Sequence, residues 1–188
     1  MKDIYKKIKL DLYRYSGKIS CKELVLNLYK SPGFRFSFFF RISKLKSRNS
    51  FLGFICYQLY KKYSIKYGFQ IPLTVEIGSG LALPHFGGIV VNSKSIIGEN
   101  CNLLHNVTLG NNKVGRKVGA PVIGNNVFVG AGAVIIGKVI IGDNVLIAPN
   151  AFVNIDIPDG CIAIGNPCKV IIKENSSELH MINSLKNI

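Results

Sequence analysis

Aliphatic residues recur at every sixth position through the middle and C-terminal parts of this chain. The clearest series has six members in a row, which are Ile123, Val129, Ile135, Ile141, Ile147 and Val153. Two earlier series keep the spacing, namely Ile71, Ile77, Leu83 and Ile89, then Val91, Ile97, Leu103 and Leu109. A period of six fits neither an amphipathic helix nor a long strand, but it fits short strands joined by tight corners. The pattern predicts a solenoid from residue 71 to 157, with one inward aliphatic side chain per strand and three strands per coil.

Residues suited to tight corners lie between the predicted strands. Glycine follows the inward residue at Gly78, Gly98, Gly110, Gly124, Gly130 and Gly142, and Asn100, Asn125, Asn126 and Asn144 lie nearby. Glycine and asparagine tolerate left-handed backbone angles most readily, so we expect both at corners that need them. The fourth position after the inward residue is also small or apolar, as in Val75, Leu81, Val107, Val127, Ala133, Val139, Val145 and Ala151. We expect these side chains to pack inside as well.

This pattern resembles the hexapeptide-repeat, left-handed parallel β-helix of the acyltransferases. The left hand comes from the resemblance, because the usual rule for parallel crossovers predicts the opposite hand. The resemblance implies a mainly β fold.

An apolar residue precedes each inward position in the later coils, at Phe128, Val134, Ile140, Leu146 and Phe152. These side chains should point outward, and a monomeric prism would leave them in water. We expect sister subunits and the chain's own N-terminal part to cover them.

The first 68 residues differ in pattern and charge from the rest. They hold 16 Lys and Arg against 3 Asp and Glu, whereas residues 69–188 hold 8 against 7. Apolar spacing predicts helices over 2–15, 21–29, 34–42 and 51–63. We therefore divide the chain into a basic helical domain (1–68), a β-helix domain (69–172) and a C-terminal tail (173–188).

The basic region is also rich in Phe, with five in the seven positions from Phe34 to Phe40. One interpretation is a helical cap whose Phe and Tyr side chains pack on the solenoid. Another is contact with an anionic membrane surface, where cationic and aromatic residues lie together at the headgroups. The two are compatible. Nucleic acid is not an expected partner, because no reader motif accompanies the charge.

Cysteine usage and the N-terminus predict a cytoplasmic protein. The five cysteines are odd in number and form no C-x-x-C pair, which is typical of reduced thiols. Residues 1–13 mix Lys with Asp and lack a secretory signal, and the longest apolar run, 51–57, is far shorter than the roughly 20 residues of a membrane span. We expect a cytoplasmic location, with peripheral contact at the inner face of the cytoplasmic membrane.

The three histidines, His85, His105 and His180, do not suggest a metal site. Zinc in a solenoid would need three coordinated ligands including a close pair, and His180 lies in the tail. We expect no metal. A polar loop over 111–120 interrupts the period of six, and it is either functional or a tolerated surface insertion.

Four segments together resemble the serine acetyltransferase branch of the hexapeptide acyltransferases. They are 83–92 (LPHFGGIVVN), 102–110 (NLLHNVTLG), 129–133 (VGAGA) and 165–169 (GNPCK), and the match spans residues 69 to 172. The resemblance implies acyl transfer from acetyl-CoA, with His85 as the general base that removes a proton from the acceptor hydroxyl. A neutral imidazole suits this role, because its ordinary pKa of about 6.5 leaves it mostly unprotonated at neutral pH.

The resemblance also implies where acetyl-CoA binds. In the family, pantetheine lies in a groove between adjacent solenoids, and the matching positions here are Gly110, Asn111, Ala131 and Pro149. Lys169, and more weakly Lys173, could meet a CoA phosphate. Because that groove lies between subunits, acetyl-CoA binding implies a homotrimer.

The chain departs from the family at the acceptor ligands. Gln70 and Pro84 replace two Asp residues, and Gly119 and Ala120 replace an Arg-His pair. A serine zwitterion needs a cation and an anion in a partly dry site, so these losses argue against serine.

The departures instead resemble the serine-acetyltransferase-like proteins of surface polysaccharide synthesis. The resulting expectation is an O-acetyltransferase for a saccharide hydroxyl, whose acceptor could be lipid-linked, with Gln70, Asn92, His105 and Asn106 as acceptor-binding candidates. Serine O-acetyltransferase and a catalytically silent trimeric scaffold are the main alternatives, with antibiotic acetylation a minor one.

Overall fold

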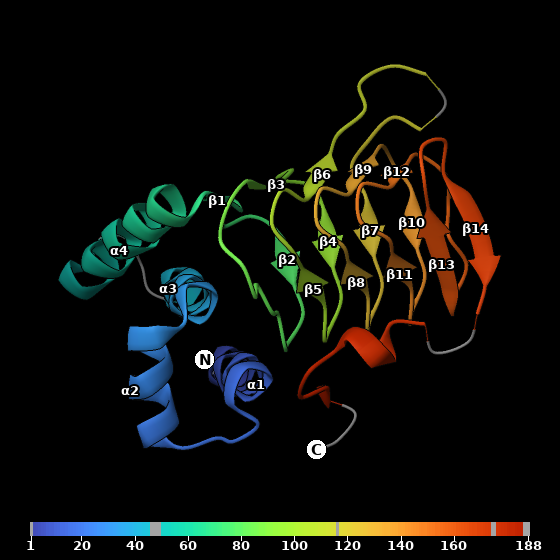
Figure 1. Ribbon diagram of the computed structural model, residues 1–188. Coiled ribbons are helices and arrows are strands. Elements are labelled where there is room, and N and C mark those ends of the chain that lie inside the picture. The colour runs from blue at the N-terminus through green and yellow to red at the C-terminus, as the bar shows by residue number, and fades with distance from the viewer. Residues whose placement is uncertain (1, 46–49, 116, 174–175, 186–188) are drawn as a thin grey trace.

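The computed structural model describes residues 2–45, 50–115, 117–173 and 176–185, and it begins with a helical cap (Figure 1). The cap contains α1 (Lys2–Ser16), α2 (Cys21–Lys30), α3 (Pro32–Leu45) and α4 (Phe51–Tyr67). Ser20 begins α2 by accepting a hydrogen bond from the Glu23 N–H, and Gly68, at φ 70°, ends α4 in the left-handed conformation. These helices confirm the elements predicted from apolar spacing, within a few residues at the ends.

A prism of three sheets follows the cap, and its strands are two to four residues long. The first sheet contains β1 (Phe69–Gln70), β3 (Ile89–Val91), β6 (Thr108–Gly110), β9 (Val134–Ile136) and β12 (Phe152–Val153). The second contains β2 (Glu76–Ile77), β4 (Ile96–Ile97), β7 (Val122–Ile123) and β10 (Ile140–Ile141). The third contains β5 (Asn102–Leu103), β8 (Phe128–Val129), β11 (Leu146–Ile147), β13 (Cys161–Ile164) and β14 (Lys169–Ile172).

Successive strands pass from sheet to sheet, and each pairs in parallel with the strand one coil away. Ile123, for example, is in register with Ile97 on one side and Ile141 on the other. Among the paired strands of the described chain, only β13 and β14 are antiparallel, and this hairpin closes the last coil. The architecture is the predicted left-handed parallel β-helix with an N-terminal helical cap.

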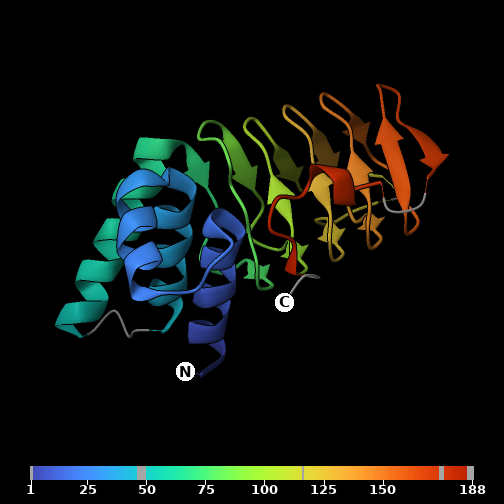
Figure 2. The same ribbon diagram turned by 60° about the horizontal axis from the view of Figure 1, so that its bottom comes forward.

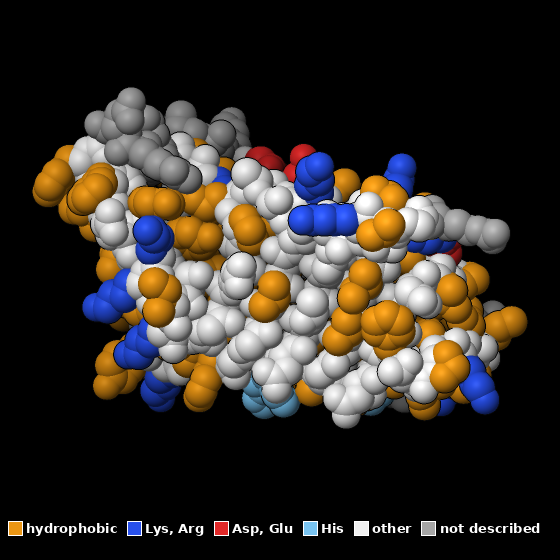
Figure 3. Space-filling model, turned by 90° about the horizontal axis from the view of Figure 1, so that it is seen from above, with side chains coloured by type: hydrophobic (Ala, Val, Ile, Leu, Met, Phe, Trp, Pro, Cys, Tyr) orange, Lys and Arg blue, Asp and Glu red, His pale blue; other side chains and the backbone are white. Residues whose placement is uncertain are grey.

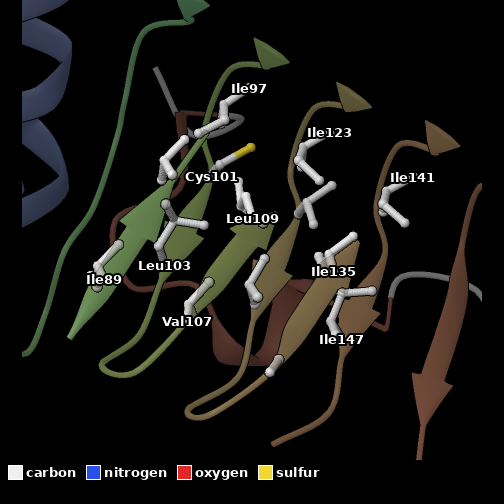
Figure 4. Close-up of a cluster of buried hydrophobic side chains, with 14 of the residues drawn as sticks. Ile89, Ile97, Cys101, Leu103, Val107, Leu109, Ile123, Ile135, Ile141 and Ile147 are labelled. Carbon is white, nitrogen blue, oxygen red and sulfur yellow. The ribbon is translucent and has the colours of Figure 1, made fainter. Parts of the chain in front are cut away.

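The interior of the prism holds the residues that the period of six selects (Figure 4). Every member of the three aliphatic series is at most 4% exposed. The fourth-position residues from Val75 to Ala151 are equally buried. Both inward positions are therefore confirmed, and burial of a Val, Leu or Ile side chain at each stabilises the coil by about 1.5–3 kcal/mol.

The corners differ in one respect from the expectation. Asn100, Asn126 and Asn144 do have left-handed backbones, with φ between 54° and 57°. Gly78 and the other glycines that follow inward residues do not. A side chain at Gly98 would instead place its Cβ 2.4 Å from the Gly124 carbonyl oxygen. These glycines permit close stacking of coils, and the asparagines supply the unusual angles.

The cap closes the N-terminal end of the prism (Figure 2). The rings of Phe36 and Phe69 lie 5.1 Å apart, centroid to centroid, and the Tyr60 hydroxyl donates to the Ile71 carbonyl oxygen at 2.8 Å. A buried ion pair joins Asp11 to Arg41, with 3.0 Å between Oδ2 and Nε. Both ion-pair partners also bond to the backbone of residues 77–81, so the cap is attached to the first coil by polar as well as aromatic contacts.

The outward apolar row is not covered by the cap, so the part of the expectation that assigned its cover to the N-terminal region is wrong, while cover by sister subunits stays a prediction. The cap packs on the first coil, and the row lies along later coils (Figures 1 and 2). Part of the cover comes from the tail, where a one-turn 3₁₀ helix, η1 (Glu178–His180), places the His180 ring 5.1 Å from that of Phe128. Ile140 remains 60% exposed.

Candidate active site

His85 lies at an exposed corner between the third and first sheets. Gly87 and Gly88 follow it with φ of 114° and 63°, in the region that favours glycine. A Cβ at Gly88 would lie 2.2 Å from the side-chain oxygen of Asn106 on the next coil. Gly88 therefore permits the close approach of the next coil, and the space beside Gly87 is open, since a Cβ there would meet no atom within 4 Å.

The structure brings His105 beside His85. The two rings meet edge to face, with centroids 5.7 Å apart and an angle of 86° between their planes. His105 follows His85 by twenty positions in the sequence, close to the length of one coil, so the two histidines occupy the same corner on neighbouring coils. His105 is half-buried and His85 is exposed, so the pair presents one accessible imidazole supported by a second.

The corner of His85 repeats on every later coil and forms a continuous edge. The Asn106 N–H donates to the Gly87 carbonyl, the Gly132 N–H to that of His105, and the Asn150 N–H to that of Ala131. His85, His105, Ala131 and Pro149 thus occupy successive coils along what we call the His85 edge. The turn at 165–167 continues it, since the Phe152 N–H bonds to the Gly165 carbonyl. Lys169 follows that turn.

The remaining candidates lie elsewhere on the first sheet or beyond it. Gly110 and Asn111 lie at the end of β6, on the opposite edge of the first sheet from Ala131. Asn92 follows β3 and bonds to the Leu109 backbone, and Gln70 pairs with Val90. Lys173 follows β14. Within one chain, Gly110 and Asn111 therefore lie at one edge of the first sheet and Ala131 at the other, while Lys173 lies beyond the third sheet.

A cavity of about 480 Å³ lies beside His85, between the cap, the third sheet and the tail. Its lining includes residues that sequence reasoning missed, notably Lys30 at the end of α2, Arg14 and Tyr15 of α1, and His180 of η1. None of the lining residues is acidic. The cavity is therefore cationic.

The cap reaches this corner because of Gly33. A Cβ there would lie 2.0 Å from the Leu83 carbonyl oxygen, so only glycine permits the close approach that brings the α2–α3 turn to the site. The Ser31-Pro32-Gly33 sequence marked a helix end but carried no sign of what the turn would contact.

Buried polar groups form the floor of the cavity. The Arg14 guanidinium donates to the Gly80 and Ile182 carbonyls and to the side-chain oxygens of Asn100 and Asn102. Burial lowers the pKa of Arg14 from its ordinary value. The Tyr15 hydroxyl accepts from the Leu83 N–H at 2.8 Å, and burial raises the pKa of this phenol, so it stays neutral.

The described residues offer no alternative centre for a metal, since no group of three His, Cys, Asp or Glu side chains comes together among them. In the same part of the chain, no helix has the length and apolarity needed to cross a bilayer.

Comparison with known proteins agrees with the β-helix fold described above. Residues 120–154 match the family described as bacterial transferase hexapeptide (six repeats). The chain is 35% identical over 150 residues to the serine acetyltransferase of Helicobacter pylori. This alignment covers 80% of this chain and 86% of that protein.

Solved structures give the same result. Soybean serine acetyltransferase complexed with serine superposes with a TM-score of 0.75 at 28% identity, covering 91% of this chain and 70% of that one. The Neisseria gonorrhoeae serine acetyltransferase in complex with serine gives 0.73 at 32% identity, covering 90% and 69%.

The β-helix, the His85 corner and these similarities define a hexapeptide-repeat acyltransferase. The chain belongs to the serine acetyltransferase family, since the Helicobacter match extends over most of both proteins.

This overturns the expectation of a saccharide O-acetyltransferase of surface polysaccharide synthesis, because the relatives and structural neighbours are serine acetyltransferases. The solenoid positions Gln70, Pro84 and Gly119 carry no charge, but folding brings Lys30 from the cap to the cavity beside His85.

Proposed function

We propose that this protein transfers the acetyl group of acetyl-CoA to the hydroxyl of serine. The observation that carries the proposal is the match over 80% of the chain to a serine acetyltransferase. An exposed imidazole at the corresponding corner, with a second imidazole 5.7 Å away, supplies the chemistry that such a transfer needs.

In the proposed mechanism, His85 accepts the proton of the serine hydroxyl as that oxygen attacks the thioester carbonyl. The oxygen–carbonyl carbon bond forms, the carbon–sulfur bond breaks, and CoA leaves as the thiol after it takes up a proton. General-base catalysis of this kind contributes roughly 10²- to 10⁴-fold in rate. Holding both substrates at a rigid corner contributes further, because the backbone there is fixed by bonds to the next coil.

Acetyl-CoA would lie along the His85 edge. Four coil steps separate His85 from the turn before Lys169, which at about 4.8 Å per step gives roughly 19 Å. An extended cofactor could place its thioester at His85 and a phosphate near Lys169, with Ala131 and Pro149 between them. Gly110, Asn111 and Lys173 stay predictions for the same cofactor.

A trimer would complete this arrangement. The outward apolar residues Val134, Ile140 and Phe152 lie on two faces of the prism, and Ile140 is 60% exposed in the single chain. Association through these faces would bury them and enclose a cofactor lying along the edge. We therefore propose a homotrimer as the active form.

Lys30 is the proposed partner of the serine carboxylate. It lines the cavity beside His85, and no acidic residue lines that cavity. The same lining offers no carboxylate for the serine ammonium, and neither Gln70 nor Pro84 supplies one. We therefore expect weak serine binding, so kcat/KM is the quantity to compare.

The test is a CoA-release assay with acetyl-CoA and either L-serine or ethanolamine, which lacks the carboxylate. We expect serine-dependent CoA release by the wild-type protein. A charge-assisted hydrogen bond contributes about 1.5–3 kcal/mol, so Lys30→Ala should lower kcat/KM for serine at least tenfold and leave ethanolamine unchanged. Lys22→Ala, at an exposed position on the same helix, is the matched control. Failure of wild-type protein to acetylate serine at any concentration would refute the proposal.

The predicted contact of residues 1–68 with an anionic membrane surface is independent of this activity. It stays a proposal, and the exposed apolar side chains of α4 are the observation that supports it.

A further inference from the structure

Helix α4 has apolar side chains on two opposite faces. Its inner face buries Gly53, Cys56, Tyr60 and Tyr67 against the rest of the protein. Its outer face exposes five large apolar side chains, which are those of Phe51, Leu52, Phe54, Ile55 and Ile65. Phe51 is 82% exposed and Ile65 is 80% exposed. Large apolar side chains gathered on one outer surface mark an interaction site more often than a bare face of a monomer, and the described residues leave this face exposed.

The aromatic residues first considered for membrane contact do not contribute to this face. Phe34, Phe36 and Phe40 of α3 have no exposed surface, since they pack within the cap and against the first coil. The expectation that placed Phe side chains on the solenoid is therefore correct for Phe36 and Phe40, which belong to the core cluster shared with the β-helix. Among the described cap helices, α4 exposes five large apolar side chains, whereas α2 exposes three, which are Val25, Leu26 and Tyr29.

The charge around this face has a single sign. Lys61, Lys62 and Lys66 lie on the exposed part of α4, next to the apolar residues. No acidic residue occurs in the sequence between Glu23 and Glu76, a span that contains nine Lys and Arg. Figure 3 shows orange and blue side chains mixed over the cap, at the left of the view, with the red ones over the solenoid.

These features favour one kind of partner. A second copy of the same face would bring lysines against lysines with no carboxylate to pair them. A nucleic acid would neutralise the lysines but would leave exposed Phe, Leu and Ile side chains without an apolar environment. The surface of an anionic bilayer satisfies both, because apolar groups enter the acyl boundary while lysines remain at the headgroups.

We propose that the outer face of α4 binds the surface of an anionic lipid bilayer, with the Phe51 end inserted and Lys61, Lys62 and Lys66 at the headgroups. The helix lies on the membrane and does not cross it. The proposal does not depend on the proposed acetyltransferase activity, because no residue of α4 lines the cavity beside His85.

The experiment is co-sedimentation of the full chain with vesicles of phosphatidylcholine alone or with 30% phosphatidylglycerol added. We expect binding to the anionic vesicles only, and release by 0.5 M NaCl. Each lysine near such a surface contributes about 1 kcal/mol, so the double charge reversal K61E/K62E should weaken partitioning at least tenfold. The double variant F51S/L52S should weaken it comparably and should keep wild-type CoA release.

Two controls carry the same chemical changes outside the cap, namely Ile172→Ser on β14 and Lys113→Glu in the 111–120 loop, both at exposed positions. Neither should alter vesicle binding. Equal binding to neutral and anionic vesicles would overturn the proposal, as would full binding by both cap variants. So would a fall in oligomer mass for F51S/L52S in sedimentation velocity with unchanged vesicle binding, because the face would then join copies of the chain.

Discussion

The β-helix and the helical cap obey different rules, although they share one chain and one interior. In the β-helix, each position repeats on the next coil, so burial, neighbours and corner geometry follow from the residue's place in the period. In the cap, each contact occurs once, as in the pair of Asp11 and Arg41 or the approach of Gly33 to Leu83. Because its positions repeat, the β-helix can be predicted from the sequence. Single contacts instead determine how the cap packs on the first coil and which cap residues line the cavity beside His85.

The attachment of the cap provides the largest expected effect. Arg41→Ala would leave Asp11 buried without its partner, and removing one member of a buried pair costs about 3–5 kcal/mol. We expect the free energy of unfolding, measured with urea, to fall by that amount. Lys117→Ala is the control, since Lys117 and Asp156 form an exposed pair worth about 0–1 kcal/mol. Equal losses in the two variants would show that the buried pair does not hold the cap.

A corner asparagine tests the repeated region. Asn126 has a left-handed backbone, with φ 54°, and its side chain bonds to those of Asn100 and Asn144. Asn126→Gly removes the two bonds at about 1 kcal/mol each, and Asn126→Ala adds a backbone cost of about 1–2 kcal/mol. The midpoint temperature of thermal unfolding should therefore be highest for the wild type, lower for Asn126→Gly and lowest for Asn126→Ala. If Ala were at least as stable as Gly, the backbone explanation of these corners would be wrong.

The buried thiol of Cys101 provides the smallest effect, and it appears only at high pH. Burial raises the pKa of Cys101 to about 12, from an ordinary value of 9.0. Between these values the unfolded chain loses this proton and the folded chain keeps it. The stabilisation is therefore complete below pH 9 and declines as the pH rises toward 12, by at most about 1.4 kcal/mol per pH unit.

The measurement is the difference in unfolding free energy between wild type and Cys101→Ala from pH 8 to 10.5. Taking a difference cancels the other groups that titrate in this range. We expect this difference to be constant up to about pH 9. Above that pH, the unfolding free energy of the wild type should fall relative to that of Cys101→Ala. A constant difference over the whole range would contradict a buried neutral thiol.

The sequence was sufficient for the interior of the β-helix, because a period of six determines which side chains of 71–157 point inward. The period did not assign a role to His85, which comes from the resemblance of segment 83–92 to the serine acetyltransferases and stays a prediction. The sequence was not sufficient for Lys30 at the end of α2, or for Arg14 and Tyr15 of α1, because no period describes how these helices pack against the first coils. Nor could it show that Phe36 is buried while Phe51 is exposed, because the two lie in similar apolar helices.

The error about the acceptor has the same physical origin. Missing charges at Gln70, Pro84, Gly119 and Ala120 were taken to exclude serine, which assumed that acceptor ligands come only from the solenoid. The cap supplies Lys30 to the cavity beside His85. The repeat therefore positions the imidazole of His85, while the single contacts of the cap line the cavity beside it.

The most direct test of this account is the rate of serine-dependent CoA release by His85→Ala protein. Circular dichroism and the unfolding midpoint must first show that the variant is folded, and Lys94→Ala, at an exposed position away from the His85 edge, is the control. The account predicts that kcat falls at least 10²-fold in His85→Ala and is unchanged in Lys94→Ala. A folded His85→Ala protein that acetylates serine at a rate near that of the wild type would contradict it.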